Sequence, residues 1–358
     1  MKKILTIVGA RPQFIKVAPV SRVLRNEFEE IIVNTGQHYD YNMSGVFFEE
    51  LNIPKPNYDL GVGSGSHGAQ TGAMLKEIED VLFKEKPDAV LVYGDTNSTL
   101  AGAIAASKLH IPLFHIEAGL RSFNKKMPEE VNRILTDHVS SLLFAPTETA
   151  VENLKNEGVV EGVHNVGDVM FDAVLYNITI ANNKYKIEDF QLESKQFVLA
   201  TIHRAENTDD LVRLEAIFES LSKLEDTIVL PLHPRTKGKL DTLGISDKIK
   251  DAKNIKIIDP VSYLEMVFLE SHSKFIITDS GGVQKEAYFA KVPCFTLRDQ
   301  TEWVETVDIG WNRLVNPVTE NLLDIVNDTQ SVEYVEHLYG NGDASSKIVK
   351  VISDYLGK

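Results

Sequence analysis

Acidic residues follow apolar segments that are typical of buried strands, and together they could transfer protons. Asp95 and Glu117 each come just after such a segment, and Glu129 and Glu130 follow Pro128 at the start of a helical pattern. A single acid at a helix start can simply cap the helix or favour its dipole. Several carboxylates that converge on one pocket indicate acid–base chemistry, because burial and like charge raise their proton affinity. Their positions at successive strand ends favour this second interpretation.

A turn near the N-terminus could bind an anion. Gly9 ends the first apolar segment, Pro12 opens a helical pattern, and Arg11 and Lys16 add positive charge. In such turns the backbone N–H groups at the start of the helix point towards an anion. An ordinary turn with two solvated cations explains the same residues, so this segment alone leaves both interpretations open.

A second turn, in the C-terminal half, carries a stronger signal. A strand pattern ends just before Ser280-Gly281-Gly282, and a helical pattern follows. Two glycines let a diphosphate approach the helix N-terminus, and Ser280 adds a hydrogen bond. Glu286 lies one to two turns into this helix, where its carboxylate could accept hydrogen bonds from two ribose hydroxyls. A capped turn with an exposed Glu is the poorer explanation, because Arg298 follows after the next strand pattern.

His203 follows another strand pattern, beside Arg204. It could carry a proton, bind phosphate or be a hydrogen-bonded structural histidine, and the local sequence leaves these open. Residues 63–68 match the Gly-x-Gly-x-x-Gly spacing, but no buried-strand pattern precedes them, so we reject a dinucleotide site. A single cysteine and the lack of a His-x-x-x-His pair make a metal site improbable. We therefore expect neither a metal nor a cofactor.

Alternating strand and helix patterns must position these residues. Short β-branched segments that are apolar on both faces, such as 4–8, 89–93 and 275–278, are typical of covered parallel strands. Helical patterns between them predict an α/β protein with doubly wound sheets. The polar stretch 182–195 predicts a boundary between two units of similar size. Because open parallel sheets bind ligands at the carboxyl ends of their strands, we expect a ligand in a cleft between the units.

Composition excludes several kinds of partner. The 358 residues include 37 Lys and Arg against 52 Asp and Glu, a net charge of −15, so we expect neither nucleic acid nor an anionic membrane surface. The one cysteine, Cys294, excludes an intramolecular disulfide and favours a reducing compartment. No segment is apolar over the length of a transmembrane helix, and the N-terminal apolar run has no signal-peptide cleavage pattern. We therefore expect a cytoplasmic protein.

Six motifs, in this order, resemble those of the non-hydrolysing UDP-N-acetylglucosamine 2-epimerase family. The motifs are Gly9-Ala10-Arg11-Pro12, Gly94-Asp95-Thr96, His115-Ile116-Glu117-Ala118-Gly119-Leu120-Arg121, Pro128-Glu129-Glu130-Val131-Asn132-Arg133, His203-Arg204-Ala205-Glu206-Asn207 and Asp279-Ser280-Gly281-Gly282. The resemblance implies two Rossmann-like doubly wound domains that face each other across a cleft, as in GT-B glycosyltransferases. Residues 1–182 would carry the catalytic carboxylates, residues 196–340 would bind UDP, and a helix in residues 341–358 would cross back to the first domain.

The resemblance also implies a role for each candidate residue. The implied catalytic residues are Asp95, Glu117, Glu129 and His203. The implied substrate-binding residues are Arg11, Lys16, Arg204, Ser280, Gly281, Gly282, Glu286 and Arg298. The expected partners are a UDP-sugar substrate and a second copy of the chain in a homodimer, with no nucleic acid, membrane, metal or cofactor.

The reaction of this family explains why several acids are needed. The C2 proton of the sugar is not acidic, so the family eliminates UDP across C1–C2 to give 2-acetamidoglucal and then adds UDP back. Elimination needs a carboxylate base near C2 and cations on the leaving diphosphate, and re-addition needs a proton donor on the opposite face. The chain would then interconvert UDP-GlcNAc and UDP-ManNAc for cell-surface polysaccharide synthesis. Which carboxylate is the base and which the acid stays open.

Several alternatives stay open beside this function. Residues 9–16 look like a branch of the family that acts on UDP-2,3-diacetamido-2,3-dideoxy-glucuronate. A GT-B glycosyltransferase would share the UDP turn but would need an acceptor site and no three converging carboxylates. A non-catalytic nucleotide-sugar sensor would be free to lose Asp95, Glu117 or His203, and all three are present. Residues 37–40 read Gln-His-Tyr-Asp where many members activated by a second substrate molecule carry Gln-His-Arg-Glu, so such activation also stays open.

Overall fold

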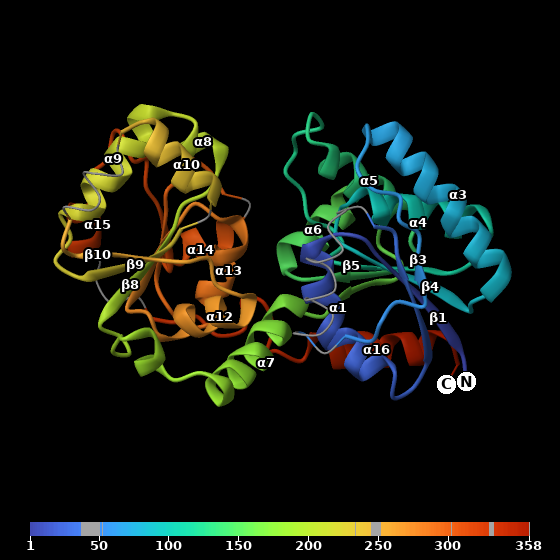
Figure 1. The fold of residues 1–358 in the computed structure, drawn as a ribbon. Helices are drawn as coiled ribbons and strands as arrows, with labels where there is room; N and C mark the ends of the chain where they lie inside the picture. The colour runs from blue at the N-terminus through green and yellow to red at the C-terminus, as the bar shows by residue number, and fades with distance from the viewer. Residues whose placement is uncertain are drawn as a thin grey trace. The chain divides into compact units, whose positions relative to one another are not determined.

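The chain divides into two compact units in a computed structural model, shown as a ribbon in Figure 1. The structure describes residues 1–36, 51, 53–232, 234–244, 252–301, 303–328 and 333–357. The first unit comprises Met1–Ala173 and Glu336–Lys358, and the second comprises Val174–Val335. The division falls inside helix α7 (Val169–Lys184), ahead of the polar stretch 182–195.

The first unit is built on one seven-stranded parallel sheet. Its strand order is β3-β2-β1-β4-β5-β6-β7. The strands are β1 (Lys3–Val8), β2 (Glu29–Asn34), β3 (Tyr58–Asp59), β4 (Ala89–Tyr93), β5 (Leu113–Ile116), β6 (Leu142–Ala145) and β7 (Val163–Asn165). Strands β4, β5 and β6 are buried throughout, as their apolar sequences predict, because helices cover both faces of the sheet. The edge strand β3 is too short to show a strand pattern in the sequence.

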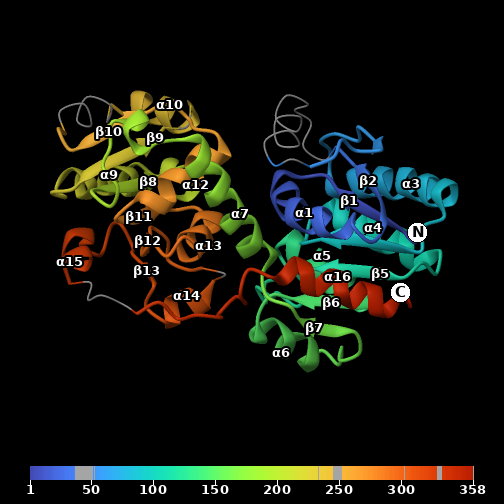
Figure 2. The ribbon, with the colours of Figure 1, turned by 90° about the horizontal axis from the view of Figure 1, so that it is seen from below.

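Helices of the first unit follow its strands and place the strand ends. They are α1 (Arg11–Leu24), α3 (His67–Glu85), α4 (Asn97–Lys108), α5 (Pro128–Val139), α6 (Glu148–Asn156) and α16 (Ala344–Tyr355). Pro12 and Pro128 stand in the first turns of α1 and α5, where a missing N–H costs nothing. The last helix, α16, lies against α1, as Figure 2 also shows. Asp172 fixes its start by accepting hydrogen bonds from the N–H groups of Ala344 (3.1 Å) and Ser345 (2.8 Å).

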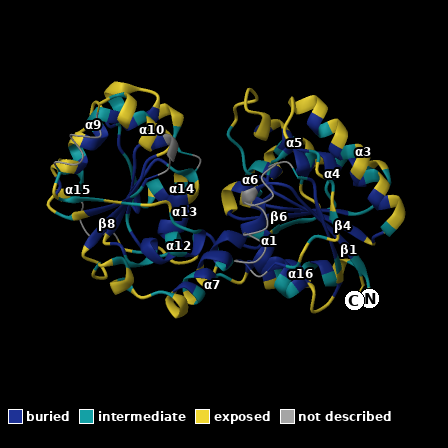
Figure 3. Cartoon of the chain, viewed as in Figure 1, coloured by how far each residue is buried: buried dark blue, intermediate teal, exposed yellow. Residues whose placement is uncertain are grey.

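A six-stranded parallel sheet forms the centre of the second unit. Its strand order is β10-β9-β8-β11-β12-β13. The strands are β8 (Phe197–Thr201), β9 (Thr227–Pro231), β10 (Ile255–Ile258), β11 (Phe275–Thr278), β12 (Cys294–Thr296) and β13 (Asn312–Leu314). The helices are α8 (Ala205–Thr208), α9 (Leu211–Ser222), α10 (Pro234–Thr242), α12 (Tyr263–His272), α13 (Gly281–Phe289), α14 (Val304–Asp308) and α15 (Leu322–Asn327), with a 3₁₀ turn at Ile187–Phe190. The sheet strands form the buried interior shown in dark blue in Figure 3.

Both units are doubly wound, which confirms the predicted α/β fold class. The strand order reverses between β1 and β4 in the first unit and between β8 and β11 in the second. Loops that follow these four strands therefore diverge to opposite sides and leave the strand ends accessible to a ligand. Within the described ranges, no helix is both long and apolar enough to cross a membrane.

Candidate active site

An ion pair joins the first helix of the first unit to the end of strand β5. The ammonium group of Lys16, in the second turn of α1, contacts the carboxylate of Glu117 directly. The two side chains are only 14% and 6% exposed, so the pair is largely shielded from water. Burial lowers the pKa of Lys16, but the charges of Glu117 and then of Asp95 outweigh burial and raise that pKa above its ordinary value. Lys16 is therefore a fixed cation among carboxylates.

Glu117 has an unusual backbone conformation. Its φ of +73° lies in the left-handed region, which a side chain other than glycine rarely adopts. The N–H groups of Glu117 and Ala118 both donate to the carbonyl oxygen of Phe144 at 3.1 Å, which holds this turn. Strain of this kind persists where the surroundings enforce it and is common at active sites. The observed outlier thus supports a functional role for Glu117.

Gly94 makes room for the carboxylate of Glu117. A Cβ atom at Gly94 would stand 3.3 Å from Oε2 of Glu117 and 3.5 Å from Nζ of Lys16. The φ of Gly94 is +62°, so this position favours glycine for its backbone as well. Strand β4 therefore ends in a turn that brings its next residue, Asp95, towards the Lys16–Glu117 pair.

Asp95 is a partly buried carboxylate with a raised pKa. Its Oδ2 lies 2.5 Å from Nη1 of Arg133, and its backbone carbonyl accepts a 2.8 Å hydrogen bond from Asn132. Burial is the largest influence and raises the pKa of Asp95, whereas the charges of Lys16 and Arg133 lower it. The negative charges of Glu117 and Glu129 also raise that pKa, and the net result lies above the ordinary value. Asp95 therefore binds a proton more readily than an ordinary aspartate.

The two glutamates at the start of α5 have different surroundings. Glu129 is exposed, whereas Glu130 is only 1% exposed. The carboxylate of Glu130 accepts hydrogen bonds from the N–H groups of Ser122 and Phe123, each at 2.9 Å, and from Arg133. Burial raises the pKa of Glu130, but these hydrogen bonds outweigh it and leave the pKa below its ordinary value. Glu130 therefore ties the preceding loop to α5, and Glu129 is the acid whose charge acts on Asp95.

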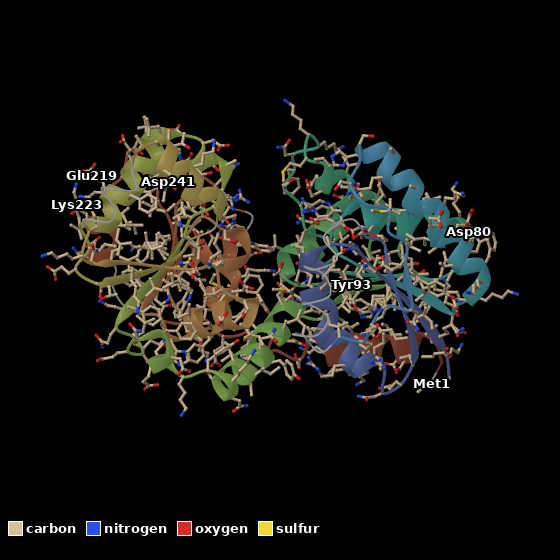
Figure 4. The ribbon with its side chains drawn as sticks, in the orientation of Figure 1. Met1, Asp80, Tyr93, Glu219, Lys223 and Asp241 are labelled. Carbon is tan, nitrogen blue, oxygen red and sulfur yellow. The ribbon has the colours of Figure 1, made fainter. Side chains whose placement is uncertain are left out.

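Gln13 holds the turn that follows β1, a role the sequence did not reveal. Its side-chain oxygen accepts hydrogen bonds from the N–H groups of Gly9 (2.8 Å) and Ala10 (3.1 Å). Its amide nitrogen donates to the carbonyl of Tyr93 at 2.9 Å; Tyr93 is labelled inside the first unit in Figure 4. These two N–H groups thus bind the side chain of Gln13, and the anion site at this turn stays a prediction. The side chain of Arg11 and residues 37–40 lie outside the described part of the chain.

Asp279 organises the strand ends of the second unit. It is fully buried and accepts hydrogen bonds from the N–H groups of His203 (3.1 Å) and Arg204 (3.0 Å) and from the side chain of Asn207 (3.2 Å). The ring Nδ1 of His203 is also 3.4 Å from Oδ1 of Asp279, while the ring itself is about half exposed, at 49%. Asp279 therefore joins the loops after β8 and β11 and orients His203. Its place directly before Ser280 at a strand end was the only sequence signal for this role.

The start of α13 has space for a ligand. Ser280 precedes the helix, its side chain makes no capping hydrogen bond, and its own N–H donates to Oγ1 of Thr278 at 2.9 Å. A Cβ atom at Gly282 would meet nothing nearer than Oγ of Ser280, 3.9 Å away. N–H groups in a first helical turn have no partners within the helix, so this end of α13 can bind an anion.

Two further candidate binding residues of the second unit have almost fully buried side chains. Glu286 is only 7% exposed, and its Oε1 accepts a 3.1 Å hydrogen bond from the hydroxyl of Tyr263. Arg298 follows β12 and is also 7% exposed. No three His, Cys, Asp or Glu side chains of the described residues come together in a way that could hold a metal ion.

Comparisons with known proteins identify the family of the chain. The family model described as UDP-N-acetylglucosamine 2-epimerase matches residues 22–353. The chain belongs to the UDP-N-acetylglucosamine 2-epimerase family. The resemblance carried by the six sequence motifs is thereby confirmed.

Individual members of this epimerase family match the chain over almost its whole length. A UDP-N-acetylglucosamine 2-epimerase homolog of Methanococcus maripaludis is 57% identical over 353 residues, 98% of this chain and 99% of that protein. The UDP-2,3-diacetamido-2,3-dideoxy-D-glucuronate 2-epimerase of Pseudomonas aeruginosa is 53% identical over 366 residues, 99% of both chains. The crystal structure of Methanocaldococcus jannaschii UDP-GlcNAc 2-epimerase in complex with UDP-GlcNAc and UDP has a TM-score of 0.84 at 48% identity and covers 99% of both chains.

Proposed function

We propose that the chain is a non-hydrolysing UDP-N-acetylglucosamine 2-epimerase, an isomerase that interconverts UDP-GlcNAc and UDP-ManNAc. The observation that carries the proposal is the cluster of Lys16, Asp95 and Glu117, held at the ends of β4 and β5 by a left-handed Glu117 and a glycine turn. Elimination of UDP to 2-acetamidoglucal and its re-addition need a base and a proton donor, and this cluster places two carboxylates beside a cation.

The surroundings of the two acids suggest their roles. Lys16 contacts the carboxylate of Glu117 in a largely shielded pair, a position that suits a base that removes the C2 proton. Asp95 has a raised pKa, which suits a donor that returns a proton to the other face of the sugar. Exposed Glu129 and half-exposed His203 remain candidates to assist, Glu129 through its charge on Asp95 and His203 through the developing charge on the leaving group.

We assign UDP to the second unit. Ser280, Gly281 and Gly282 would bind the diphosphate at the open start of α13, and Arg204 and Arg298 would add positive charge. Glu286 would accept hydrogen bonds from the ribose, with Tyr263 orienting its carboxylate. In the first unit, Arg11 and Lys16 would complete the substrate contacts. The complex of the M. jannaschii relative with UDP-GlcNAc and UDP supports the class of substrate.

Sequence identity to a named relative supports a second candidate substrate, UDP-2,3-diacetamido-2,3-dideoxy-glucuronate. The P. aeruginosa relative named for UDP-2,3-diacetamido-2,3-dideoxy-glucuronate is 53% identical, while the M. jannaschii relative named for UDP-GlcNAc is 48% identical. The same elimination and re-addition at C2 would serve this sugar, because the chemistry involves the same C1–C2 bond. Identity across the whole chain therefore does not separate the two substrates.

The deciding experiment follows each UDP-sugar by proton NMR in D2O. Conversion of UDP-GlcNAc with deuterium at C2 of the product supports the first proposal, and conversion of the diacetamido uronate alone supports the second. Product that keeps its original C2 hydrogen would rule out elimination. UDP binding without any conversion would instead indicate a non-catalytic sensor, and transfer of the sugar to an added acceptor would indicate a glycosyltransferase.

We propose that the protein works in the cytoplasm, where its product would feed cell-surface polysaccharide synthesis. We also propose that two copies of the chain form a homodimer. Support for the dimer comes from Met127, directly before α5, and from Val131 and Leu135 in α5, which stand one helical turn apart and are 40%, 40% and 44% exposed. Apolar side chains aligned on one exposed helix face are typical of protein interfaces. Analytical ultracentrifugation should show a dimer that Leu135→Glu weakens, whereas a monomeric wild-type chain would refute the assembly.

A further inference from the structure

A largely buried network of polar side chains contacts the backbone near Asp95 and Glu117. His115 on β5 and Asp137 on α5 have fully buried side chains. The ring Nδ1 of His115 is 2.7 Å from Oδ1 of Asp137, and its Nε2 is 2.8 Å from the carbonyl oxygen of Gly94. Asp137 also accepts a 3.1 Å hydrogen bond from the N–H of Gly119 through its other oxygen, Oδ2.

Arg121 completes this network. Its Nη1 lies 2.8 Å from Oδ2 of Asp137, and its Nε and Nη2 donate to the two oxygens of Glu157 at 2.7 and 2.8 Å. Burial raises the pKa of Asp137, but the hydrogen bonds and charges of His115 and Arg121 outweigh it and leave the pKa below its ordinary value. Asp137 is therefore an ionised acceptor.

The contact with Gly94 requires a proton on one ring nitrogen of His115. A backbone carbonyl can only accept a hydrogen bond, so Nε2 must carry a proton to bind Gly94. Asp137 holds the opposite side of the ring through Nδ1, and the ring has no exposed surface.

The two ends of this network lie next to the proposed catalytic acids. Gly94 directly precedes Asp95, and Gly119 lies two residues after Glu117. A well-packed apolar pair is often as stable as a buried ion pair or more so, so a core role alone does not explain these charges. We propose that His115 is a positioning residue that fixes the carbonyl of Gly94 and with it the placement of Asp95 relative to Glu117. The catalytic part of this inference rests on the proposed epimerase activity.

The contact with Gly94 can be tested without any assay of activity. In the protein labelled with ¹⁵N-histidine, a long-range ¹H–¹⁵N spectrum should show one imidazole that carries a proton on Nε2, the nitrogen that faces the Gly94 carbonyl. Its signals should vanish in His115→Gln, which assigns them. A wild-type His115 with an unprotonated Nε2 would overturn the contact.

Two conservative variants test the positioning role. Gln places its amide nitrogen near the position of Nε2 and can still donate to Gly94, whereas Asn places it near Nδ1 and can reach only Asp137. We expect kcat to fall by about 100-fold in His115→Asn, the cost of misplacing reacting groups by about 1 Å, and by no more than about tenfold in His115→Gln. KM for the UDP-sugar should change little in either. His110→Asn, an exposed histidine with a φ of +57°, is the control.

Thermal unfolding of the same variants separates positioning from stability. The proposal expects the two variants to be destabilised to a similar degree while their kcat values differ. Equal kcat values, or a greater loss in His115→Gln, would overturn the role of the Gly94 contact. A wild-type protein that converts neither UDP-sugar would refute the proposed function, while the NMR measurement would still decide whether Nε2 of His115 can donate to Gly94.

Discussion

Lys16 and Glu117 form an ion pair across the carboxyl edge of the first sheet, between α1 and the end of β5, with both side chains less than one-sixth exposed. The pair joins a cation, which the turn after β1 brings to this edge, to an acid whose own backbone is in the left-handed region. Removing one partner of a shielded pair leaves the other charge without compensation, so the two residues should depend on each other.

Lys16→Met should therefore impair both folding and activity. It leaves the carboxylate of Glu117 buried beside Gly94 without its cation, and we expect the free energy of unfolding to fall by about 3–5 kcal/mol. Urea unfolding measures this change, and the double variant Lys16→Met/Glu117→Gln should recover part of it. Lys76→Met, on the exposed face of α3, is the control and should change stability by less than about 0.5 kcal/mol. Equal effects of the two Lys→Met changes would contradict the pair.

Glu117→Gln should separate catalysis from nucleotide binding. Gln keeps the shape of the side chain but cannot take up a proton, and loss of a general base costs on the order of 10²–10⁴ in rate. We expect kcat to fall by this factor, while the affinity for UDP, measured by calorimetry, stays near the wild-type value because the proposed UDP contacts lie mainly in the second unit. Glu152→Gln, exposed on α6, should leave kcat unchanged. Normal turnover by Glu117→Gln would remove Glu117 from the proposed chemistry.

Gly282→Val should weaken UDP binding without harming the fold. In the protein itself a Cβ atom at Gly282 has free space, since Oγ of Ser280, its nearest neighbour, is 3.9 Å away. The same space is where a diphosphate would approach α13, so the valine should lower UDP affinity about tenfold or more, a loss of at least ~1.4 kcal/mol. Gly68→Val is a matched control, because Gly68 is also the second residue of its helix and also has open space around its Cβ position. An unchanged affinity in a folded Gly282→Val protein would exclude this UDP site.

Local patterns in the sequence predicted much of the fold and the location of the site. Apolar β-branched segments predicted β4 and β5, and the residues directly after them, Asp95 and Glu117, do lie near Lys16. These features depend on neighbours in the sequence, since a strand end and the next turn are continuous. The doubly wound order follows in turn from the regular alternation of strands and helices.

Contacts between distant segments could not be predicted in the same way. Glu129 and Glu130 are adjacent acids with no difference in the local sequence pattern. Glu130 is the buried acid because residues 122–123 pack against the start of α5 and donate hydrogen bonds to its carboxylate. The side chain of His115 on β5 contacts Asp137 on α5 and the carbonyl of Gly94 after β4. The side-chain amide of Gln13 on α1 donates to a carbonyl of β4. The side chain that satisfies a buried donor or acceptor depends on the tertiary structure, which a local pattern does not contain.

Glu270 should make the stability of the second unit depend on pH. It is fully buried in α12, and neither carboxylate oxygen has a hydrogen-bond partner in the described part of the chain. Burial, and then the charge of Glu286, raise the pKa of Glu270 well above its ordinary value. The folded state therefore holds this proton more tightly than the unfolded state, so stability falls as pH rises above the unfolded pKa of about 4.3.

Glu270→Gln should remove this dependence, because the amide has nearly the same shape and no charge to bury. The gain in free energy of unfolding over the wild type should be near zero at about pH 4 and should grow by up to ~1.4 kcal/mol per pH unit until the folded pKa is reached. Urea unfolding at several pH values measures the difference, with Glu225→Gln, an exposed acid of the same unit, as the control. A gain that is constant with pH would show that Glu270 has the same proton affinity in both states, and a loss that grows with pH would show that the folded protein stabilises its charge.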